Sequence, residues 1–160
     1  MLAKLADEAL SGKAARPMDL AIAEAERARA RGEVPIGAVI VSAKGEILAR
    51  AGNRTLELHD PTAHAEMLAI RAACAKLGNE RLVNCDLYVT LEPCAMCAAA
   101  ISFARIRRLY FGAADPKGGA VEHGPRFFTQ ATCHHAPEAI GGVGEARAAA
   151  LLKDFFAERR

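Results

Sequence analysis

The sequence predicts a single α/β domain, and three observations lead to this fold class. A chain of 160 residues suits one domain with a substantial core. Short runs rich in β-branched residues alternate along it with segments whose apolar residues recur at helical spacing. Residues 87–112 contain a strand, a helix and a strand in succession, which implies a right-handed parallel crossover. The composition, 52% hydrophobic and 25% charged, is ordinary for a globular domain.

The first element of the domain is expected to be a helix that starts at Met18 and ends at Gly32. Its Glu and Arg residues are expected to pair on a solvated face. Residues 1–17 precede it as an N-terminal extension, either a loosely docked helix or a disordered segment. Because we find no internal repeat and no second domain, residues 18–160 are expected to form one folded unit.

A hairpin and a second helix follow. Val34–Ser42 is a buried-strand candidate, Lys44-Gly45 is typical of a hairpin turn, and Glu46–Ala51 is the antiparallel partner. Thr62 is expected to cap the next helix, Ala63–Leu77.

The second half is expected to contain two more strands and two more helices. The strands are Leu87–Leu91 and Arg108–Gly112, and the helices are Cys94–Ala104 and Gly144–Arg160. Residues 115–137 show no sustained period, which predicts a long ordered loop with at most one helical turn.

Two short motifs, His64-Ala65-Glu66 and Pro93–Cys97, contain the residues that could bind a metal or take part in catalysis. His64, Cys94 and Cys97 offer the three ligands that a catalytic zinc takes while it keeps one position for water. If Pro93 begins a helix, both cysteines lie in its first turn, where the helix dipole favours thiolates. Both motifs are expected to meet at the sheet edge where the helices begin.

Glu66 is placed to move protons to and from a metal-bound water. The motif order matches the H-x-E…P-C-x-x-C signature of zinc-dependent nucleobase deaminases. In that chemistry, hydroxide formed on zinc attacks the ring carbon that carries the amino group, and the glutamate shuttles protons until ammonia leaves. A zinc-stabilised RNA-binding module without catalysis is an alternative, but a structural zinc needs no shuttle.

Net charge, hydropathy and cysteine count indicate which partners and which cellular compartment to expect. A net charge of +2 and a pI near 8.3 permit nucleic-acid binding without demanding it. No apolar run reaches membrane-spanning length, and the N-terminus lacks a continuous apolar signal segment. The odd count of five cysteines fits a reducing cytoplasm better than a disulfide framework. We therefore expect a cytoplasmic protein without a membrane partner.

Several segments, two of which include these motifs, are similar to one known family. They are Glu33–Val39, Asp60–Glu66, Leu87–Ala98, Phe111–Ala113 with Asp115 and Lys117, and Leu151–Phe156. Through them, residues 18–160 resemble the bacterial tRNA-specific adenosine deaminases, which make inosine at the tRNA wobble position.

The resemblance implies a three-layer α/β/α cytidine-deaminase-like fold with a central mixed five-stranded sheet. It also implies a homodimer with one Zn²⁺ per subunit, held by His64, Cys94 and Cys97. The implied reaction is hydroxide attack on C6 of adenosine in the tRNA anticodon loop, with Glu66 as the proton shuttle.

The resemblance also suggests where the substrate is bound. A base stacked inside RNA cannot reach a buried zinc, so the target must be splayed out of its loop. Asn53 matches the family's asparagine that contacts the flipped-out nucleoside, although a loop asparagine can also satisfy its own turn. Ala65 and Asp115 are further expected substrate contacts, with a turn residue as the alternative for Asp115. Arg159 and Arg160 are expected against the RNA backbone.

The runner-up function is a free nucleobase or nucleoside deaminase of the guanine or cytosine type with the same zinc chemistry. Guanine deaminases often carry Pro-Cys-Pro-Met-Cys, whereas this chain has Ala95 at the third position. Gly118–Pro137 is longer than the same loop in enterobacterial relatives, which affects substrate preference more than reaction class. Cys133-His134-His135 within it is interpreted as structural or RNA-facing, and Arg105–Arg108 as either a solvated patch or a phosphate contact.

Overall fold

The computed structural model describes residues 16–159, which form four α-helices, five strands and one 3₁₀ turn. Residues 1–15 of the predicted extension, and Arg160, lie outside the described residues. The elements in order are α2 (Pro17–Ala30), β1 (Gly37–Val41), β2 (Ile47–Gly52), α3 (Ala65–Leu77), β3 (Asp86–Leu91), α4 (Ala95–Phe103), β4 (Arg108–Ala113), η1 (Phe127–Thr129), β5 (Glu138–Ile140) and α5 (Glu145–Ala157).

The five strands form one mixed sheet in the order β2-β1-β3-β4-β5. β1 pairs antiparallel with β2 and with β3, while β4 pairs parallel with β3 and with β5. The connection β3-α4-β4 is therefore a parallel crossover. The five-stranded sheet and the crossover confirm the predicted fold class.

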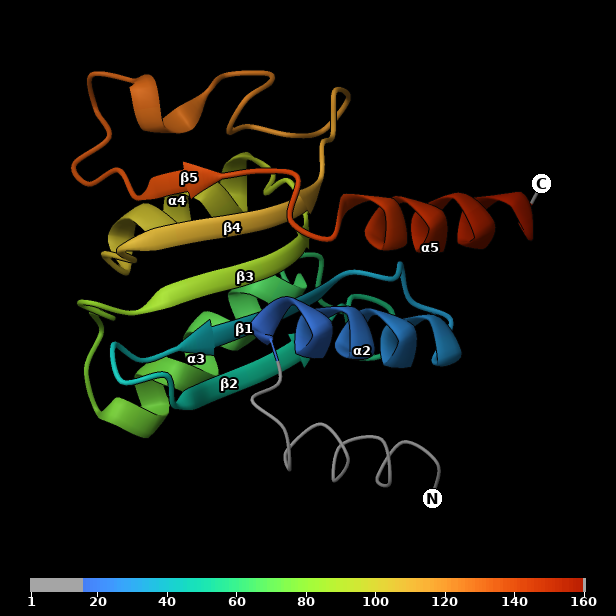
Figure 1. Ribbon diagram of the computed structural model, residues 1–160, viewed down its shortest axis with the longest axis horizontal. Helices are drawn as coiled ribbons and strands as arrows, with labels where there is room; N and C mark the ends of the chain where they lie inside the picture. The colour runs from blue at the N-terminus through green and yellow to red at the C-terminus, as the bar shows by residue number, and fades with distance from the viewer. Residues whose placement is uncertain (1–15, 160) are drawn as a thin grey trace.

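Helices cover both faces of the sheet, so the domain has three layers (Figure 1). α3 and α4 lie on one face, and α2 and α5 lie on the other. Because side chains alternate along a strand, Leu87 and Val89 enter the core under α3 and α4, while Tyr88 packs on the α2 side. The larger apolar core lies between the sheet and the α3/α4 layer, directly beneath the two predicted motifs.

Gly37 allows α2 to cross β1 at close range. A Cβ atom at this position would lie 1.9 Å from the carbonyl oxygen of Ala21 and 2.6 Å from the amide nitrogen of Ala25. No side chain fits there, since both obstacles are backbone atoms of α2. The glycine therefore sets the distance between this helix and the sheet.

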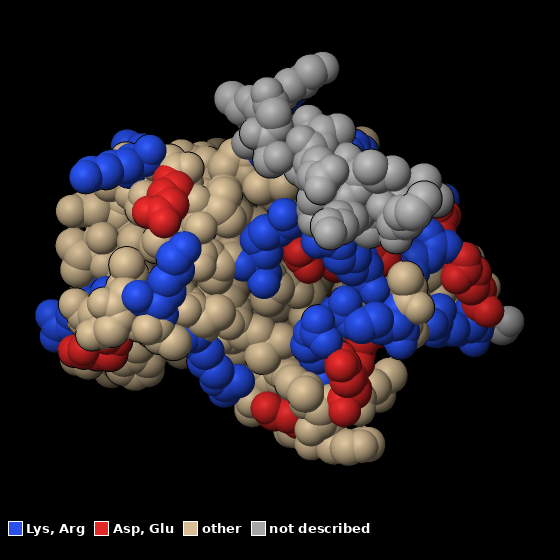
Figure 2. All heavy atoms as spheres, turned by 90° about the horizontal axis from the view of Figure 1, so that it is seen from below, with Lys and Arg blue, Asp and Glu red and all other residues tan. Residues whose placement is uncertain are grey.

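The solvated side of α2 carries the predicted Glu–Arg pairs. Glu24 Oε1 lies 2.6 Å from Arg27 Nη1 and 3.0 Å from Arg50 Nε. Figure 2, which views the molecule from below, shows Lys and Arg side chains interspersed with Asp and Glu on this side. This face is a mixed surface of ion pairs, each of which adds little stability.

The predicted cap at Thr62 is wrong. α3 begins at Ala65 with His64 as its N-cap, and the His64 side chain makes no capping hydrogen bond. Thr62 is engaged elsewhere, because its hydroxyl and its backbone N–H both donate to Asp60 Oδ1, at 2.6 and 2.8 Å. The Asp60 turn thus delays the helix by two residues and leaves His64 at its start.

Two further expectations need correction. α4 begins at Ala95, after Cys94 at the N-cap, so Pro93 precedes the helix and does not start it. β5 was not expected from residue patterns. With three residues, two exposed and one partly buried, it has too little apolar alternation to be recognised.

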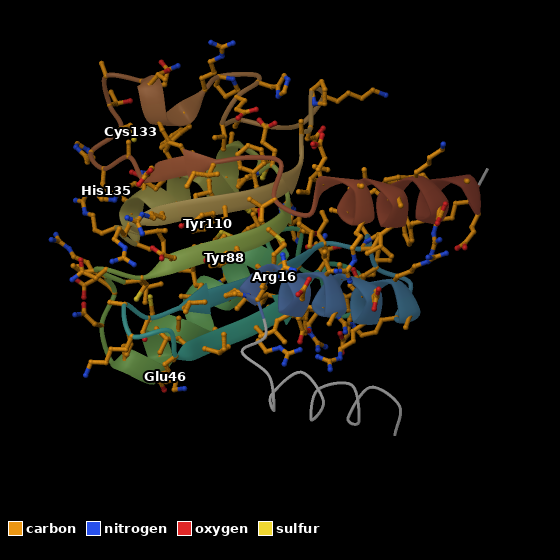
Figure 3. All side chains as sticks on the ribbon, in the orientation of Figure 1. Arg16, Glu46, Tyr88, Tyr110, Cys133 and His135 are labelled. Carbon is orange, nitrogen blue, oxygen red and sulfur yellow. The ribbon has the colours of Figure 1, made fainter. Side chains whose placement is uncertain are left out.

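The long segment between β4 and β5 contains the one expected turn of helix, η1. Near its C-terminal end, Cys133 contacts α4 and His135 contacts the chain that follows α4; both residues are labelled in Figure 3. Cys133 Sγ lies 3.5 Å from Ser102 Oγ, and His135 Nε2 donates to the Ile106 carbonyl at 2.7 Å. The structural interpretation of this cluster agrees with these contacts.

No helix within residues 16–159 is long and apolar enough to cross a bilayer.

Candidate active site

Two helix starts bring the predicted metal ligands together. His64 and Cys94 are the N-cap residues of α3 and α4, and both have extended backbone angles. Neither side chain caps its own helix. Cys97 lies in the first turn of α4 and is completely buried. The backbone therefore places an imidazole and two thiols at the positive ends of two helix dipoles.

The three ligand atoms are close enough to share one ion. His64 Nδ1 lies 3.7 Å from Cys94 Sγ and 3.5 Å from Cys97 Sγ. All three ligand atoms lie within 4.8 Å of one another. Within residues 16–159, no other group of three His, Cys, Asp or Glu side chains meets this condition.

The cluster stabilises one thiolate at neutral pH. The hydrogen bond from the Cys97 thiol lowers the pKa of Cys94 to about 4, helped by His64 and opposed by burial. The pKa of Cys97 is raised by its hydrogen bond to Cys94, by burial and by the nearby Glu66 charge. The pKa of His64 is also raised, mainly by its bond to Cys94. Thiolate is the form that binds a metal.

Glu66 lies in the first turn of α3 and is 4% exposed. Burial raises the pKa of its carboxyl, while hydrogen bonds from its own backbone N–H and from Cys97 act in the opposite direction. With His64, Cys94, Asp115 and Gly118, it lines a pocket of about 170 Å³. A buried carboxylate beside a metal site and a small pocket suits proton transfer.

A wider groove of about 640 Å³ lies next to this pocket, and both hollows are lined by Leu91 and Asp115. Its apolar lining comes from Val34, Ala114, Leu152 and Phe156, and its basic groups are Lys117 and Arg159. The groove combines apolar contact area with two cations.

Asn53 ties the end of β2 to the start of α3. Its side chain is buried, and its Oδ1 accepts a hydrogen bond of 2.8 Å from the backbone N–H of Ala65. Ala65 is completely buried. This contact positions the residue next to His64, and a direct contact of Asn53 or Ala65 with substrate stays a prediction.

Asp115 and Arg159 both reach the groove. Asp115 Oδ1 accepts the backbone N–H groups of Lys117 and Gly118 at 3.2 and 3.0 Å, so the predicted turn role is present. The Arg159 guanidinium lies 3.4 Å from the centre of the Phe155 ring. Arg160 lies outside the described residues.

A family model for the cytidine and deoxycytidylate deaminase zinc-binding region matches residues 12–113. The tRNA-specific adenosine deaminase of Agrobacterium fabrum is 64% identical over 143 residues, which cover 89% of this chain and 93% of that protein. The chain belongs to this deaminase family. It is an enzyme, and zinc is its cofactor.

Two solved structures similar to the deaminase bear on its substrate. One comes from a study of A-to-I editing by tRNA deaminases at the wobble position of transfer RNA. It is 65% identical, has a TM-score of 0.84 and covers 85% of this chain and 98% of that one. Guanine deaminase from Bacillus subtilis is 33% identical, has a TM-score of 0.61 and covers 89% of this chain and 91% of its own. The deaminase is more similar to the structure from the tRNA-editing study than to this guanine deaminase, in both sequence identity and TM-score.

Two buried carboxylates of the deaminase were missed by reasoning from the sequence. Glu33 accepts hydrogen bonds from the backbone N–H groups of Leu56 and Glu57 at 3.0 and 2.9 Å. Glu92 accepts backbone hydrogen bonds from Asp115 and from residues 121–123. The available signal was a charged residue inside an otherwise apolar segment, as in Leu91-Glu92-Pro93.

The basic run Arg105–Arg108 of the deaminase lies away from the pocket. It leads into the amino end of β4, whereas the pocket is lined by Leu91 at the carboxyl end of the parallel strand β3. Arg107 pairs with Asp86 at 2.9 Å and Arg108 with Glu138 at 3.1 Å. These pairs favour the solvated-patch interpretation.

Proposed function

We propose that the protein deaminates adenosine to inosine at the wobble position of tRNA, with zinc held by His64, Cys94 and Cys97 and with Glu66 as the proton shuttle. The observation that carries the proposal is the convergence of these three ligands and Glu66 at one pocket. The 64% identity to a tRNA-specific adenosine deaminase supports the choice of substrate.

The donor set fits zinc. One imidazole and two sulfur atoms within 4.8 Å of one another match the three protein ligands of a catalytic zinc site. The lowered pKa of Cys94, caused mainly by the Cys97 hydrogen bond, shows that the cluster favours a thiolate. When bound, zinc supplies a water of lowered pKa as the nucleophile for C6.

Glu66 would act as the general base and general acid of the reaction. One of its carboxylate oxygens accepts a proton from the attacking water and passes it to N1 of the adenine ring. Glu66 then takes the remaining proton of that water from the new C6 hydroxyl and passes it to the exocyclic amino group. The C6–N6 bond breaks, ammonia leaves, and the product is inosine. Its burial and its place in the lining of the pocket keep these transfers away from bulk water.

The groove next to the pocket would hold the RNA around the flipped nucleoside. Lys117 and Arg159 can contact phosphates, while Leu152 and Phe156 offer apolar surface to bases. Asn53 would donate its amide N–H to the nucleoside, since its carbonyl oxygen already binds Ala65. Asp115 lines both the groove and the pocket, so it would lie beside the bound nucleotide.

The enzyme would act in the cytoplasm as a homodimer, through one domain over residues 18–160. The expectation of a dimer rests on the resemblance to the family. Sedimentation at the concentration of the assay tests it, and a monomer that reacts at full speed would contradict it.

The deciding experiment is inosine formation by the purified, zinc-loaded protein on an anticodon stem-loop with adenosine at the wobble position. Guanine, cytosine and cytidine run beside it. Inosine at that one adenosine is the expected result. Ammonia from guanine and none from RNA would overturn the choice of substrate and favour the relationship to the guanine deaminase, which is 33% identical.

A further inference from the structure

Glu92 is a buried charge whose partners all lie in one distant segment. It follows β3 directly, and its side chain has no exposed area. All of its carboxylate contacts come from residues 115–123, in the long segment after β4. A buried carboxylate is tolerated only with such compensation, so the contacts must form whenever the fold does.

Both oxygens of Glu92 are occupied by hydrogen bonds. Oε1 accepts the backbone N–H of Asp115 at 3.0 Å and lies 2.8 Å from His123 Nδ1. Oε2 accepts three successive backbone N–H groups, those of Val121, Glu122 and His123, at 3.2, 3.1 and 3.2 Å. Consecutive N–H groups that converge on one oxygen form an anion-binding nest.

This segment also contributes to the lining of the pocket. Asp115 and Gly118 belong to that lining, together with Glu92 itself and the helix-start residues His64 and Cys94. The backbone N–H of Ala120 donates to the carbonyl of Pro93 at 2.9 Å, next to the ligand Cys94. This wall segment, residues 115–123, is therefore joined directly to the chain that holds the metal ligands.

Gly119 shows how tightly the wall is held. A Cβ atom at this position would lie 2.4 Å from Glu92 Oε2 and 2.5 Å from the carbonyl oxygen of Asp115. Neither atom can withdraw, because the carboxylate is fixed by its partners and the carbonyl accepts the N–H of Gly119 at 2.8 Å. Any side chain here would push the wall away from Glu92.

We propose that Glu92 is a positioning residue that holds residues 115–123 as the wall of the substrate pocket. It places Asp115 and Gly118 against the bound nucleotide. Although Glu92 belongs to the pocket lining, its side chain has no exposed area and both of its oxygens are bound to residues 115–123, so it acts through that segment. The identity of that nucleotide rests on the function proposed above. The hydrogen-bonded wall itself does not depend on it.

Glu92→Gln is the direct test. Each oxygen of Glu92 faces at least one backbone N–H, so either orientation of the new amide sets its NH₂ group against a donor. Gln keeps the size of the side chain and changes no metal ligand. We expect one zinc per chain, a KM for the stem-loop raised at least about tenfold, and a single-turnover rate at saturating RNA within about threefold of the parent.

Two further variants separate positioning from general stability. Asp86→Asn neutralises another buried carboxylate at the opposite end of β3, where it pairs with Arg107. It should lower the melting temperature and leave KM within about twofold. Gly119→Ala keeps the carboxylate and displaces the wall, so it should raise KM as Glu92→Gln does. If Glu92→Gln fails to fold, the KM of Gly119→Ala tests whether the position of residues 115–123 affects substrate binding.

Hydrogen exchange of the zinc-loaded chain tests the wall without a substrate. Peptides that cover residues 115–123 should exchange at least about tenfold faster in Glu92→Gln than in the parent. In Asp86→Asn they should exchange at the parent rate. If the parent makes no inosine, the proposed function fails and this comparison alone decides for or against Glu92. Unchanged exchange, or a KM in both Glu92→Gln and Gly119→Ala that equals the parent value, would overturn the proposal.

Discussion

Asn53 Oδ1 accepts the backbone N–H of Ala65 at 2.8 Å and thereby joins the end of β2 to the start of α3. Ala65 directly follows His64, the proposed zinc ligand, so this bond helps to fix the imidazole. Asn53 would then serve both the metal site and the nucleoside, through different atoms of one carboxamide. The two roles can be separated by substitution.

Asn53→Ala should destabilise the fold by about 1–3 kcal/mol, because it leaves a buried N–H without an acceptor. Zinc affinity should fall with it. Asn53→Asp keeps an acceptor at the helix start and removes only the amide donor. It should retain zinc and most of the melting temperature and still lose activity on RNA. Equal activity in Asn53→Asp and the parent would argue against a donor role for Asn53.

Glu66→Gln should abolish inosine formation while zinc stays bound. The loss expected for a general acid–base group is about 10²–10⁴-fold. Because the buried carboxyl becomes a neutral amide of the same size, the fold should not be weakened. Zinc content by elemental analysis and inosine by chromatography are the two measurements. Ammonia release that survives the substitution would mean that another group is the shuttle.

Removing a ligand should remove zinc and activity together. Cys94→Ala is expected to lose the metal and to unfold at lower temperature, since metal binding is coupled to folding. Cys133→Ala is the matched control, because Cys133 lies near Ser102 and outside the ligand cluster. Normal zinc content in Cys94→Ala would show that the ligands are assigned incorrectly.

The metal site could be predicted from sequence because its information is local. His64 with Glu66, and Cys94 with Cys97, each lie within one short motif, and each motif precedes or begins a helix. The cap at Thr62 failed for a local reason too, since Asp60 competes for the threonine hydroxyl. Propensity cannot decide which of two nearby partners a side chain takes.

The walls of the pocket could not be predicted in the same way. Glu33 and Glu92 bind backbone N–H groups between 23 and 31 residues away, and backbone groups leave no mark in a sequence. β5 has the same difficulty, because its pairing with β4 involves three residues and little burial. These features depend on tertiary contacts that only the folded chain reveals.

Glu33→Gln should loosen the loop that leads from β2 toward His64. The Glu33 carboxylate is buried and accepts the N–H groups of Leu56 and Glu57. Both donors bind Oε1, so an amide can keep its carbonyl oxygen there, but it loses the negative charge and sets its NH₂ group against the Leu56 N–H, which also reaches Oε2 at 3.3 Å. The melting temperature should therefore fall and peptides over residues 54–63 should exchange faster. Exchange of residues 115–123 should stay at the parent rate, because Glu92 anchors that segment separately.

Arg159→Ala should weaken RNA binding without affecting zinc. The guanidinium of Arg159 is stacked 3.4 Å from the Phe155 ring centre, donates to the Phe155 carbonyl at 3.2 Å, and lines the groove next to the pocket. If it contacts a phosphate, its loss should reduce the slope of log affinity against log salt by about one. Filter binding of the anticodon stem-loop over a range of salt concentrations measures this slope.

The matched control is Arg147→Ala, on α5, the helix that Arg159 follows. Arg147 pairs with Asp19 at 2.9 Å and does not belong to the groove lining, so its loss should leave the slope unchanged. Arg159→Lys adds a second comparison, because lysine keeps the charge and loses the planar stacking on Phe155. Recovery of the slope in Arg159→Lys would identify charge as the contribution of Arg159. An unchanged slope in Arg159→Ala would place the RNA backbone elsewhere on the surface.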